Sequence, residues 1–166
     1  MKHTPAATAE EMRDTLRLWP SGVSIVTTSD GERVSGMAVS AFNSLSMEPP
    51  LILVCPHQAS TPGQLVQLTR RFAVSILGAG QAHISDLFAG RVPLDHKEER
   101  FIGLATHTAV TGSPILSDSV AWLDCRVHEQ HDGVTHWIVV GEVLATGANP
   151  ERDPLLYYNR DYHTLG

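Results

Sequence analysis

The chain has 166 residues, the size of one average domain, so we expect a single domain spanning 1–166. A hydrophobic share of 42% with only 18% charged residues supplies a buried core and excludes an intrinsically disordered chain. The 12 Lys and Arg against 18 Asp and Glu give a net charge of −6, which has the wrong sign for a nucleic-acid partner.

The N-terminal residues lack the apolar stretch of a signal peptide, and no apolar run is long enough to cross a bilayer. Cys55 and Cys125 lie far apart inside apolar, strand-like runs without a CxxC pair, which favours buried thiols in a reducing compartment. We therefore expect a cytoplasmic protein with no membrane partner.

A short amphipathic helix is the first predicted element. Thr8 and Glu11 have the spacing of a capping box, and Pro20 ends the helix. The apolar residues that fall on one face of this helix are Met12, Leu16 and Trp19.

Strands are predicted next. A β-branched run at 23–28, the turn Asp30-Gly31 and the segment 33–39 indicate a hairpin. After a loop that ends in a Pro-Pro pair, the continuous apolar run at 51–55 is too short for a helix and predicts a buried strand.

The middle of the chain alternates short helices with a strand. Thr61 as N-cap followed by Pro62 at the first helical position predicts a helix to about Thr69. Further on, we expect a strand at 72–77, a short helix at 81–88 closed by Gly90, and a solvated charged surface at 95–100.

A long hairpin is predicted near the C-terminus, with strands at 120–130 and 136–144 and a turn at Asp132-Gly133. The aromatic segment 154–165 should pack against the rest of the chain. Strands separated by turns, with few helices and no regular strand-helix alternation, favour a mainly β, closed antiparallel barrel over a doubly wound sheet.

Standard catalytic motifs are absent: there is no GxGxxG, Walker loop, GxSxG or HExxH. The nine His are scattered, so we expect no metal site. Three other groups remain, each with a plain structural alternative. The small and hydroxylated residues of 36–46 suit a flat ligand but also a Ser-rich loop, and Ser60-Thr61 suit an anion but also ordinary capping. His136, beside a hairpin turn, suits a functional site, but a lone His in a strand is more often structural.

Taken together and in order, these segments resemble the short-chain flavin reductase family, the reductase components of two-component flavin monooxygenases such as 4-hydroxyphenylacetate monooxygenase. The most specific stretch is GMAVSAFNSLSMEPP at 36–50. The segments that support it are GVSIVT at 22–27, 51–61, 72–77 with Gln81, FAG at 88–90, AWLDC at 121–125 and the closing pattern 154–162.

The resemblance implies an FMN-binding split barrel, a homodimer, and NAD(P)H-dependent reduction of FMN or FAD, with reduced flavin passing to a partner monooxygenase. We expect FMN and NADH, with FAD and NADPH left open. Two alternatives also stay open: a flavin carrier or sensor without NAD(P)H turnover, and a tight flavoprotein that reduces another acceptor such as ferric iron.

The resemblance also implies roles for individual residues. Those expected to bind the cofactor are Met37, Ala38, Val39, Ser40 and Ala41 along the flavin ring and ribityl chain, Ser46 and Pro50 at the border of the cleft, and His57, Gln58, Ser60 and Thr61 at the phosphate. His136 is expected to be the catalytic-site residue that orients the nicotinamide. Members often read Gly-Asp-His where this chain has Val134-Thr135-His136, so the turn there is expected to differ.

Overall fold

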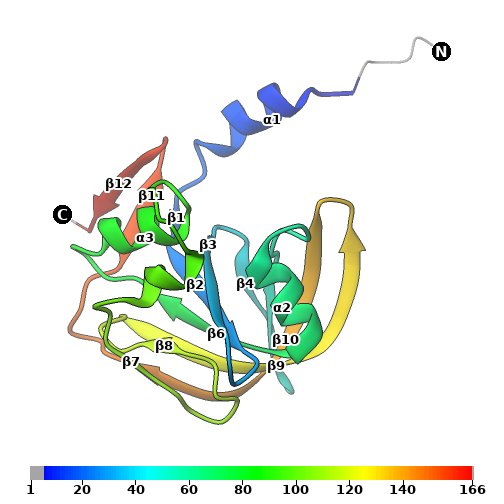
Figure 1. Cartoon of the computed structure of the whole chain (residues 1–166). Coiled ribbons are helices and arrows are strands. Elements are labelled where there is room, and N and C mark those ends of the chain that lie inside the picture. The colour runs from blue at the N-terminus through cyan, green and yellow to red at the C-terminus, as the bar shows by residue number, and fades with distance from the viewer. Residues whose placement is uncertain (1–5, 166) are drawn as a thin grey trace.

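A seven-stranded antiparallel sheet forms the centre of the molecule (Figure 1). The structure is a computed structural model that describes residues 6–165. Residues 1–5, part of the segment considered for a signal peptide, lie outside the described residues. In order across the sheet, its strands are Val34–Val39 (β3), Ser24–Ser29 (β2), Arg71–Ile76 (β6), Ala121–Gly133 (β9), His136–Ala148 (β10), Pro50–Val54 (β5) and Phe42–Met47 (β4).

The predicted mainly β, antiparallel architecture is confirmed, with one refinement. β3 and β4 are the two ends of the hydrogen-bonded ladder and do not pair with each other in the described part of the chain, so the sheet curves without closing. Only Ser40 and Ala41 separate these two strands in the sequence. The gap in the barrel therefore coincides with the Ser-rich segment predicted to bind a flat ligand.

Two smaller sheets flank the large one. Ser21–Gly22 (β1), Leu155–Tyr158 (β11) and Asp161–Thr164 (β12) form one, and Thr106–His107 (β7) and Ile115–Leu116 (β8) form the other. The prediction that the aromatic C-terminal segment packs on the fold is confirmed, since Leu155 is buried and Tyr157 and Tyr162 pack against the same cluster.

The helices are Ala9–Leu16 (α1), Thr61–Thr69 (α2), Ala82–Phe88 (α3) and a 3-10 turn, Lys97–Phe101 (η1). Both α2 and α3 lie against β2 and β3. Within residues 6–165, no helix has the length and apolar character needed to cross a bilayer.

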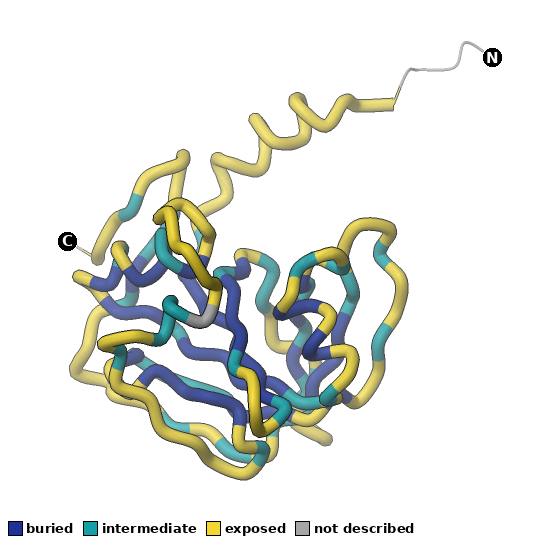
Figure 2. Tube along the Cα trace, viewed as in Figure 1, coloured by how far each residue is buried: buried dark blue, intermediate teal, exposed yellow. Residues whose placement is uncertain are grey.

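The first helix forms as predicted and has no buried residue; it contacts the turn between β11 and β12, where Asp14 pairs with Arg160 at 3.5 Å. Its capping box is complete, with Thr8 Oγ1 accepting from the Glu11 N–H and the Thr8 N–H donating to Glu11 Oε2 at 2.8 Å. The helix projects from the barrel and is exposed along its whole length (Figures 1 and 2). Met12 and Trp19 remain 60% and 74% exposed.

Two apolar clusters lie on the two faces of the strands, because successive side chains of a strand alternate in direction. One cluster includes Val26, Phe72 and Cys125, and the other includes Ile25 and Phe88. Burial raises the pKa of the Cys125 thiol to about 12. The prediction of a buried thiol is confirmed for Cys125 and wrong for Cys55, which is only half-buried. This partial burial still raises the pKa of the Cys55 thiol.

Two sequence-based boundaries need correction. The turn of the long hairpin lies at Val134-Thr135 and not at Asp132-Gly133, because β9 continues to Gly133 and pairs it with His136. The Ser-rich segment after Ala41 is not a loop but the edge strand β4, whose partner is β5 alone.

The hairpin of β9 and β10 makes one close contact in the core, between Gly141 and Phe72. Its register shifts between Val140 and Gly141, where Gly141 lies against the ring of the fully buried Phe72. A Cβ atom on Gly141 would lie 2.4 Å from Phe72 Cζ. Glycine is therefore required for this strand to approach β6.

Gly141→Ala should lower the free energy of unfolding by about 1–3 kcal/mol, the usual cost of overpacking a core. Urea unfolding measures this loss. Gly22→Ala is the matched control, because a Cβ there would meet no atom within 4 Å. Equal stability of the two variants would contradict the contact.

Candidate functional site

The end of β3 presents its backbone, and not its larger side chains, to the surface. Met37 and Val39 belong to the barrel core, whereas Ala38 packs on the opposite face. Ser40 is exposed and Ala41 half-buried at the gap between β3 and β4. The side chains of Met37 and Val39 are thus buried, which leaves mainly their main-chain atoms near the surface.

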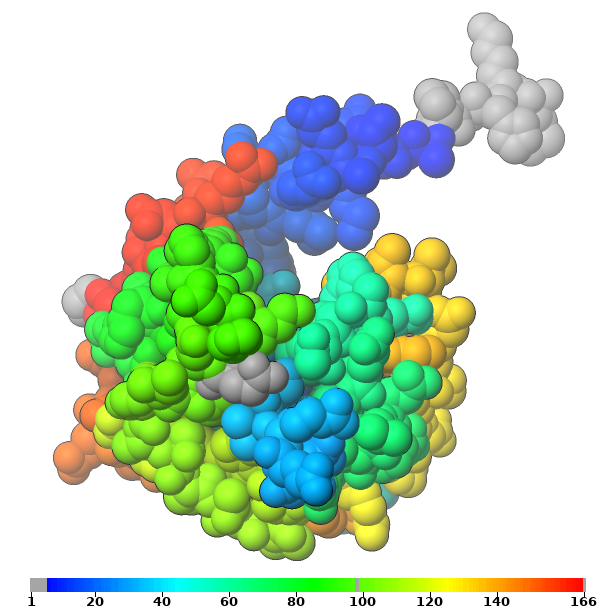
Figure 3. Space-filling view, in the orientation of Figure 1, coloured from blue at the N-terminus to red at the C-terminus, as the bar shows by residue number. Residues whose placement is uncertain are grey.

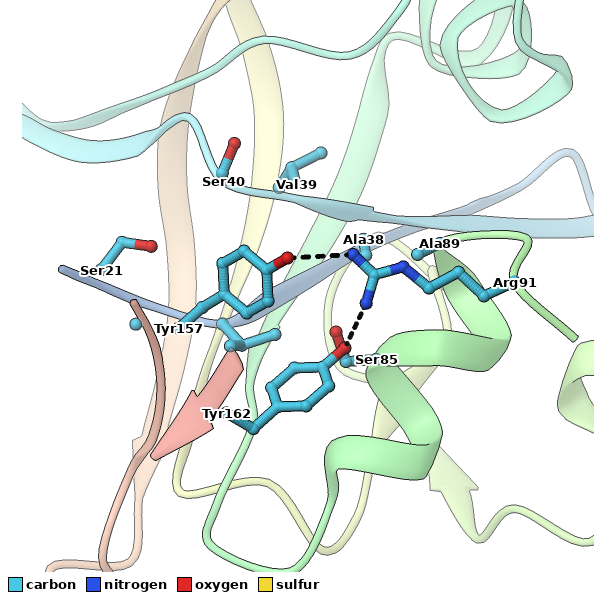
Figure 4. A pocket seen from close by; sticks show the side chains of 11 residues that line it. Ser21, Ala38, Val39, Ser40, Ser85, Ala89, Arg91, Tyr157 and Tyr162 are labelled. Carbon is cyan, nitrogen blue, oxygen red and sulfur yellow. Dashed lines mark hydrogen bonds between the residues drawn. The ribbon is translucent and has the colours of Figure 1, made fainter. Parts of the chain in front are cut away.

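A pocket lies beside this backbone, between the end of β3, the helix α3 and the small C-terminal sheet (Figure 4). It is lined by Ala38, Val39 and Ser40 from β3 and its end, by Ser21, Gly22 and Val23, by Ser85, Ala89 and Arg91, and by Tyr157 and Tyr162. Three of the predicted cofactor residues therefore come together here. A neighbouring groove under α1 contains Ser40 and Ala41.

A charged network that the sequence analysis missed forms one wall of this pocket. Arg91 donates to the hydroxyls of Tyr157 at 3.1 Å and Tyr162 at 3.3 Å (Figure 4). It also pairs with Asp86 at 2.8 Å. Tyr162 donates to Asp86 at 2.7 Å, and this bond is the largest cause of the lowered pKa of Asp86. The only sequence indication was the aromatic character of the C-terminal segment.

The start of α2 forms a second group, and here the N-cap prediction is wrong by one residue. The N-cap is Ser60, whose Oγ accepts from the Gly63 N–H at 3.1 Å and donates to the His57 carbonyl at 2.7 Å. Thr61 is the first helical residue. A Cβ on Gly63 would lie 2.2 Å from the His57 oxygen, so this tight turn requires glycine.

The predicted phosphate-binding residues differ in whether their polar groups are already hydrogen-bonded within the turn. The Ser60 hydroxyl is engaged within the turn, whereas Thr61 is exposed. Lys97 of η1 donates from Nζ to Thr61 Oγ1 at 3.2 Å, which brings a cation to the helix start. The sequence analysis had assigned Lys97 only to a solvated surface.

Arg100, from the same charged segment, is turned inward. Its Nη1 donates to the Gly36 carbonyl of β3 at 3.2 Å, and its Nε is buried without a hydrogen-bond partner among the described residues. The prediction of a wholly solvated surface at 95–100 is therefore wrong for Arg100. The turn η1 instead connects the start of α2 to β3.

His57 and His136 come together although they are distant in sequence. Their rings are edge to face with centroids 4.9 Å apart, and the two residues form an isolated β-bridge. Gln58 donates from Nε2 to Asp132 at 2.8 Å and to the His136 carbonyl at 3.3 Å. Its side chain therefore binds the hairpin of β9 and β10.

The remaining predicted residues, Ser46 and Pro50, lie elsewhere. They flank the turn between β4 and β5, at the opposite end of that hairpin from Phe42 and Val54. Neither lines the pocket beside β3 or the groove under α1. A hydrogen bond links the backbone of 38–41 to the segment before α2, because the Cys55 N–H donates to the Ala41 carbonyl. Cys55 lies two residues before His57.

Comparisons with known proteins identify the family. A family model described as a flavin reductase like domain matches residues 16–166. The chain is 35% identical to the FMN reductase (NADH) RutF 2 of Rhizobium rhizogenes, over 98% of this chain and 92% of that protein. It is 34% identical to HsaB of Mycobacterium tuberculosis, a reductase subunit of a flavin-dependent monooxygenase, over 90% of this chain and 79% of that protein.

A solved structure gives the same assignment. The flavin reductase HpaC complexed with NADP+ matches with a TM-score of 0.84 and 31% identity, over 95% of this chain and 98% of that one. Sequence identity above 30% over nearly the full length and a matching family model lead to one conclusion: the chain belongs to the flavin reductase-like domain family.

Proposed function

We propose that this chain is an NAD(P)H-dependent flavin reductase that transfers a hydride from NADH to FMN and supplies the reduced flavin to a monooxygenase. The observation that carries the proposal is the presence of two candidate binding groups, joined in the chain by the Cys55–Ala41 hydrogen bond: the backbone of 38–41 beside the gap, and the start of α2 with His57 and His136 near it. FAD and NADPH are the alternative nucleotides. The relative HsaB is named as the reductase subunit of a flavin-dependent monooxygenase, which supports a monooxygenase as the partner of this chain.

The residues present fit a phosphorylated flavin. The buried Arg100 Nε lacks a partner in the part of the chain described, and Thr61 and Lys97 offer a hydroxyl and a cation at the start of a nine-residue helix. A helix start favours an anion through its dipole. We assign the phosphate to Thr61 and Lys97, with Ser60 and His57 shaping the turn that presents them.

Flavin and nicotinamide supply the hydride chemistry when bound, so the chain itself needs to bind and orient them. The backbone of 38–41 and the flanking pocket hold the ring system in this proposal. His136 lies beside His57, before the start of α2, and in this proposal it orients the nicotinamide. Ser46 and Pro50 keep the role of bordering residues only if a second copy of the chain brings them to a cleft.

The decisive experiment is NADH oxidation by the purified protein with and without added FMN. We expect turnover that saturates with FMN, and His136→Ala should reduce it by about tenfold while oxidised FMN still binds, because the side chain orients the donor and not the flavin. Bound flavin without oxidation of NADH or NADPH would replace the proposal with a carrier or sensor. Unchanged turnover in the variant would remove His136 from the site.

The phosphate assignment has its own test. Lys97→Ala should weaken FMN binding by roughly threefold to tenfold, since one exposed charge-assisted contact is lost, and should leave riboflavin binding unchanged. Fluorescence titration measures both ligands. Lys97→Arg is the charge-matched control, and the loss should shrink at high salt. Equal weakening of FMN and riboflavin would place the phosphate elsewhere.

We also propose that the protein is a homodimer whose second copy covers α1 and β4. The helix α1 stands out from the body of the molecule (Figure 3), and its apolar side is exposed in the single chain. The edge strand β4 exposes Leu45 and, at 76%, Met47. Exposed apolar surface next to an unpaired strand edge is typical of an interface. Among the described residues, the ion pair of Asp14 with Arg160 at 3.5 Å lies on the polar side of α1 and leaves Met12, Leu16 and Trp19 exposed.

Trp19→Ser should raise the dimer dissociation constant at least roughly tenfold, because large aromatic side chains dominate interface energetics. Sedimentation equilibrium measures the constant. Ile102→Ser is the control, because Ile102 is equally exposed, at 76%, on a different segment. A wild-type chain that is monomeric at micromolar concentration would refute the proposal.

A further inference from the structure

The tip of the β9–β10 hairpin has an unusual backbone. Val134 has a φ of +73°, in the left-handed region that β-branched residues rarely occupy. Its side chain is 86% exposed, so burial of the valine does not compensate for this conformation. Other contacts must therefore hold the tip in place.

Asp132 supplies the first of these contacts. Its Oδ1 accepts from the Val134 N–H at 2.8 Å, and the Gly133 carbonyl accepts from the Thr135 N–H at 3.0 Å. The turn is tight, because a Cβ on Gly133 would lie 2.6 Å from the His136 carbonyl oxygen. Asp132 thus fixes the strained residue from two positions upstream.

The same carboxylate also reaches across to the start of α2. Asp132 Oδ1 accepts from Gln58 Nε2 at 2.8 Å, while the Gln58 N–H donates to the Thr135 carbonyl at 3.0 Å. The two bonds that Asp132 accepts lower its pKa, the one from Val134 more than the one from Gln58. One carboxylate therefore joins the hairpin tip to the segment that leads into Thr61.

His136 is the first residue after this turn, and its position depends on it. Its Nδ1 is 2.9 Å from the Thr135 hydroxyl, and its ring meets His57. Because His136 is exposed, packing alone does not fix the imidazole. The turn geometry and the segment around Gln58 determine where the ring lies.

We propose that Asp132 is a positioning residue of the reductase: it holds the hairpin tip against Gln58, so that His136 stands at a fixed place relative to the phosphate-binding start of α2. This inference rests on the proposed function of His136. It adds a residue that contacts neither nucleotide and acts through Gln58 and Val134. Its effect should fall on the nicotinamide donor more than on FMN.

The test compares Asp132→Ala with Asp132→Asn, whose amide oxygen can still accept both bonds. Asp132→Ala should lower kcat/KM for NADH by roughly tenfold, in the range for a displaced orienting group, with FMN affinity changed by less than about twofold. Asp132→Asn should restore most of the loss. Glu151→Ala removes an exposed acidic side chain on a distant turn and should behave as wild type.

A second readout does not depend on turnover. The imidazole signals of His136 in ¹H–¹⁵N spectra of the ligand-free protein should shift or broaden in Asp132→Ala and return in Asp132→Asn. Should the wild-type chain fail to oxidise NADH, the proposed function falls, and these spectra still decide whether Asp132 positions His136.

Three results would overturn the inference. The first is a kcat/KM for NADH within about twofold of wild type in Asp132→Ala. The second is an unchanged His136 spectrum in that variant. The third is a parallel loss of FMN binding and turnover in both Asp132 variants, which would reveal a general structural role.

Discussion

The antiparallel ladder between β9 and β10 is the interaction on which the rest of the structure depends. Its two strands pair with β6 on one side and β5 on the other, so this hairpin joins the two halves of the sheet. The close approach of Gly141 to Phe72 sets the register in the core. The same register then determines where His136 emerges at the far end. Core packing and the position of His136 thus both depend on the β9–β10 hairpin.

The gap between β3 and β4 gives the site its chemical character. Met37 and Val39 are committed to the core, and what remains at the surface is main chain, small side chains and hydroxyls. Such a wall permits close approach by a planar ring, and the polar atoms that it offers are in a backbone held by the β2–β3 ladder. Charged groups enter from separate segments, through Arg91 on one side and Lys97 on the other.

Residue composition was sufficient for most strands, because the run at 23–28 is rich in β-branched residues and the runs at 51–55 and 72–77 are mostly apolar. The first and last of these are largely buried, whereas 51–55 alternates between buried and half-buried residues. The prediction failed for β4, since Asn43, Ser44 and Leu45 are all exposed on an edge strand and have no apolar alternation to recognise. The helix cap was misplaced because Ser60 and Thr61 are both good N-caps and proline is tolerated at either of the next positions.

The candidate site was recognised largely through resemblance to a family, and local composition could not have completed it. The roles of Arg100 and Lys97 depend on where η1 folds, and a charged stretch looks solvated until its neighbours are known. The departure from the family pattern at Val134-Thr135 was visible in the sequence, and Asp132 lies just before it. The structure shows that the Asp132 carboxylate accepts a hydrogen bond from the Val134 N–H, in the turn before His136.

The buried thiol of Cys125 has a consequence for the environment in which such an enzyme would work. Reduced flavin that meets oxygen generates hydrogen peroxide, and peroxide oxidises cysteine through the thiolate. With a pKa of about 12 and no exposed surface, Cys125 stays a thiol out of contact with solvent. This core thiol is thereby protected from the oxidant that the proposed product would form.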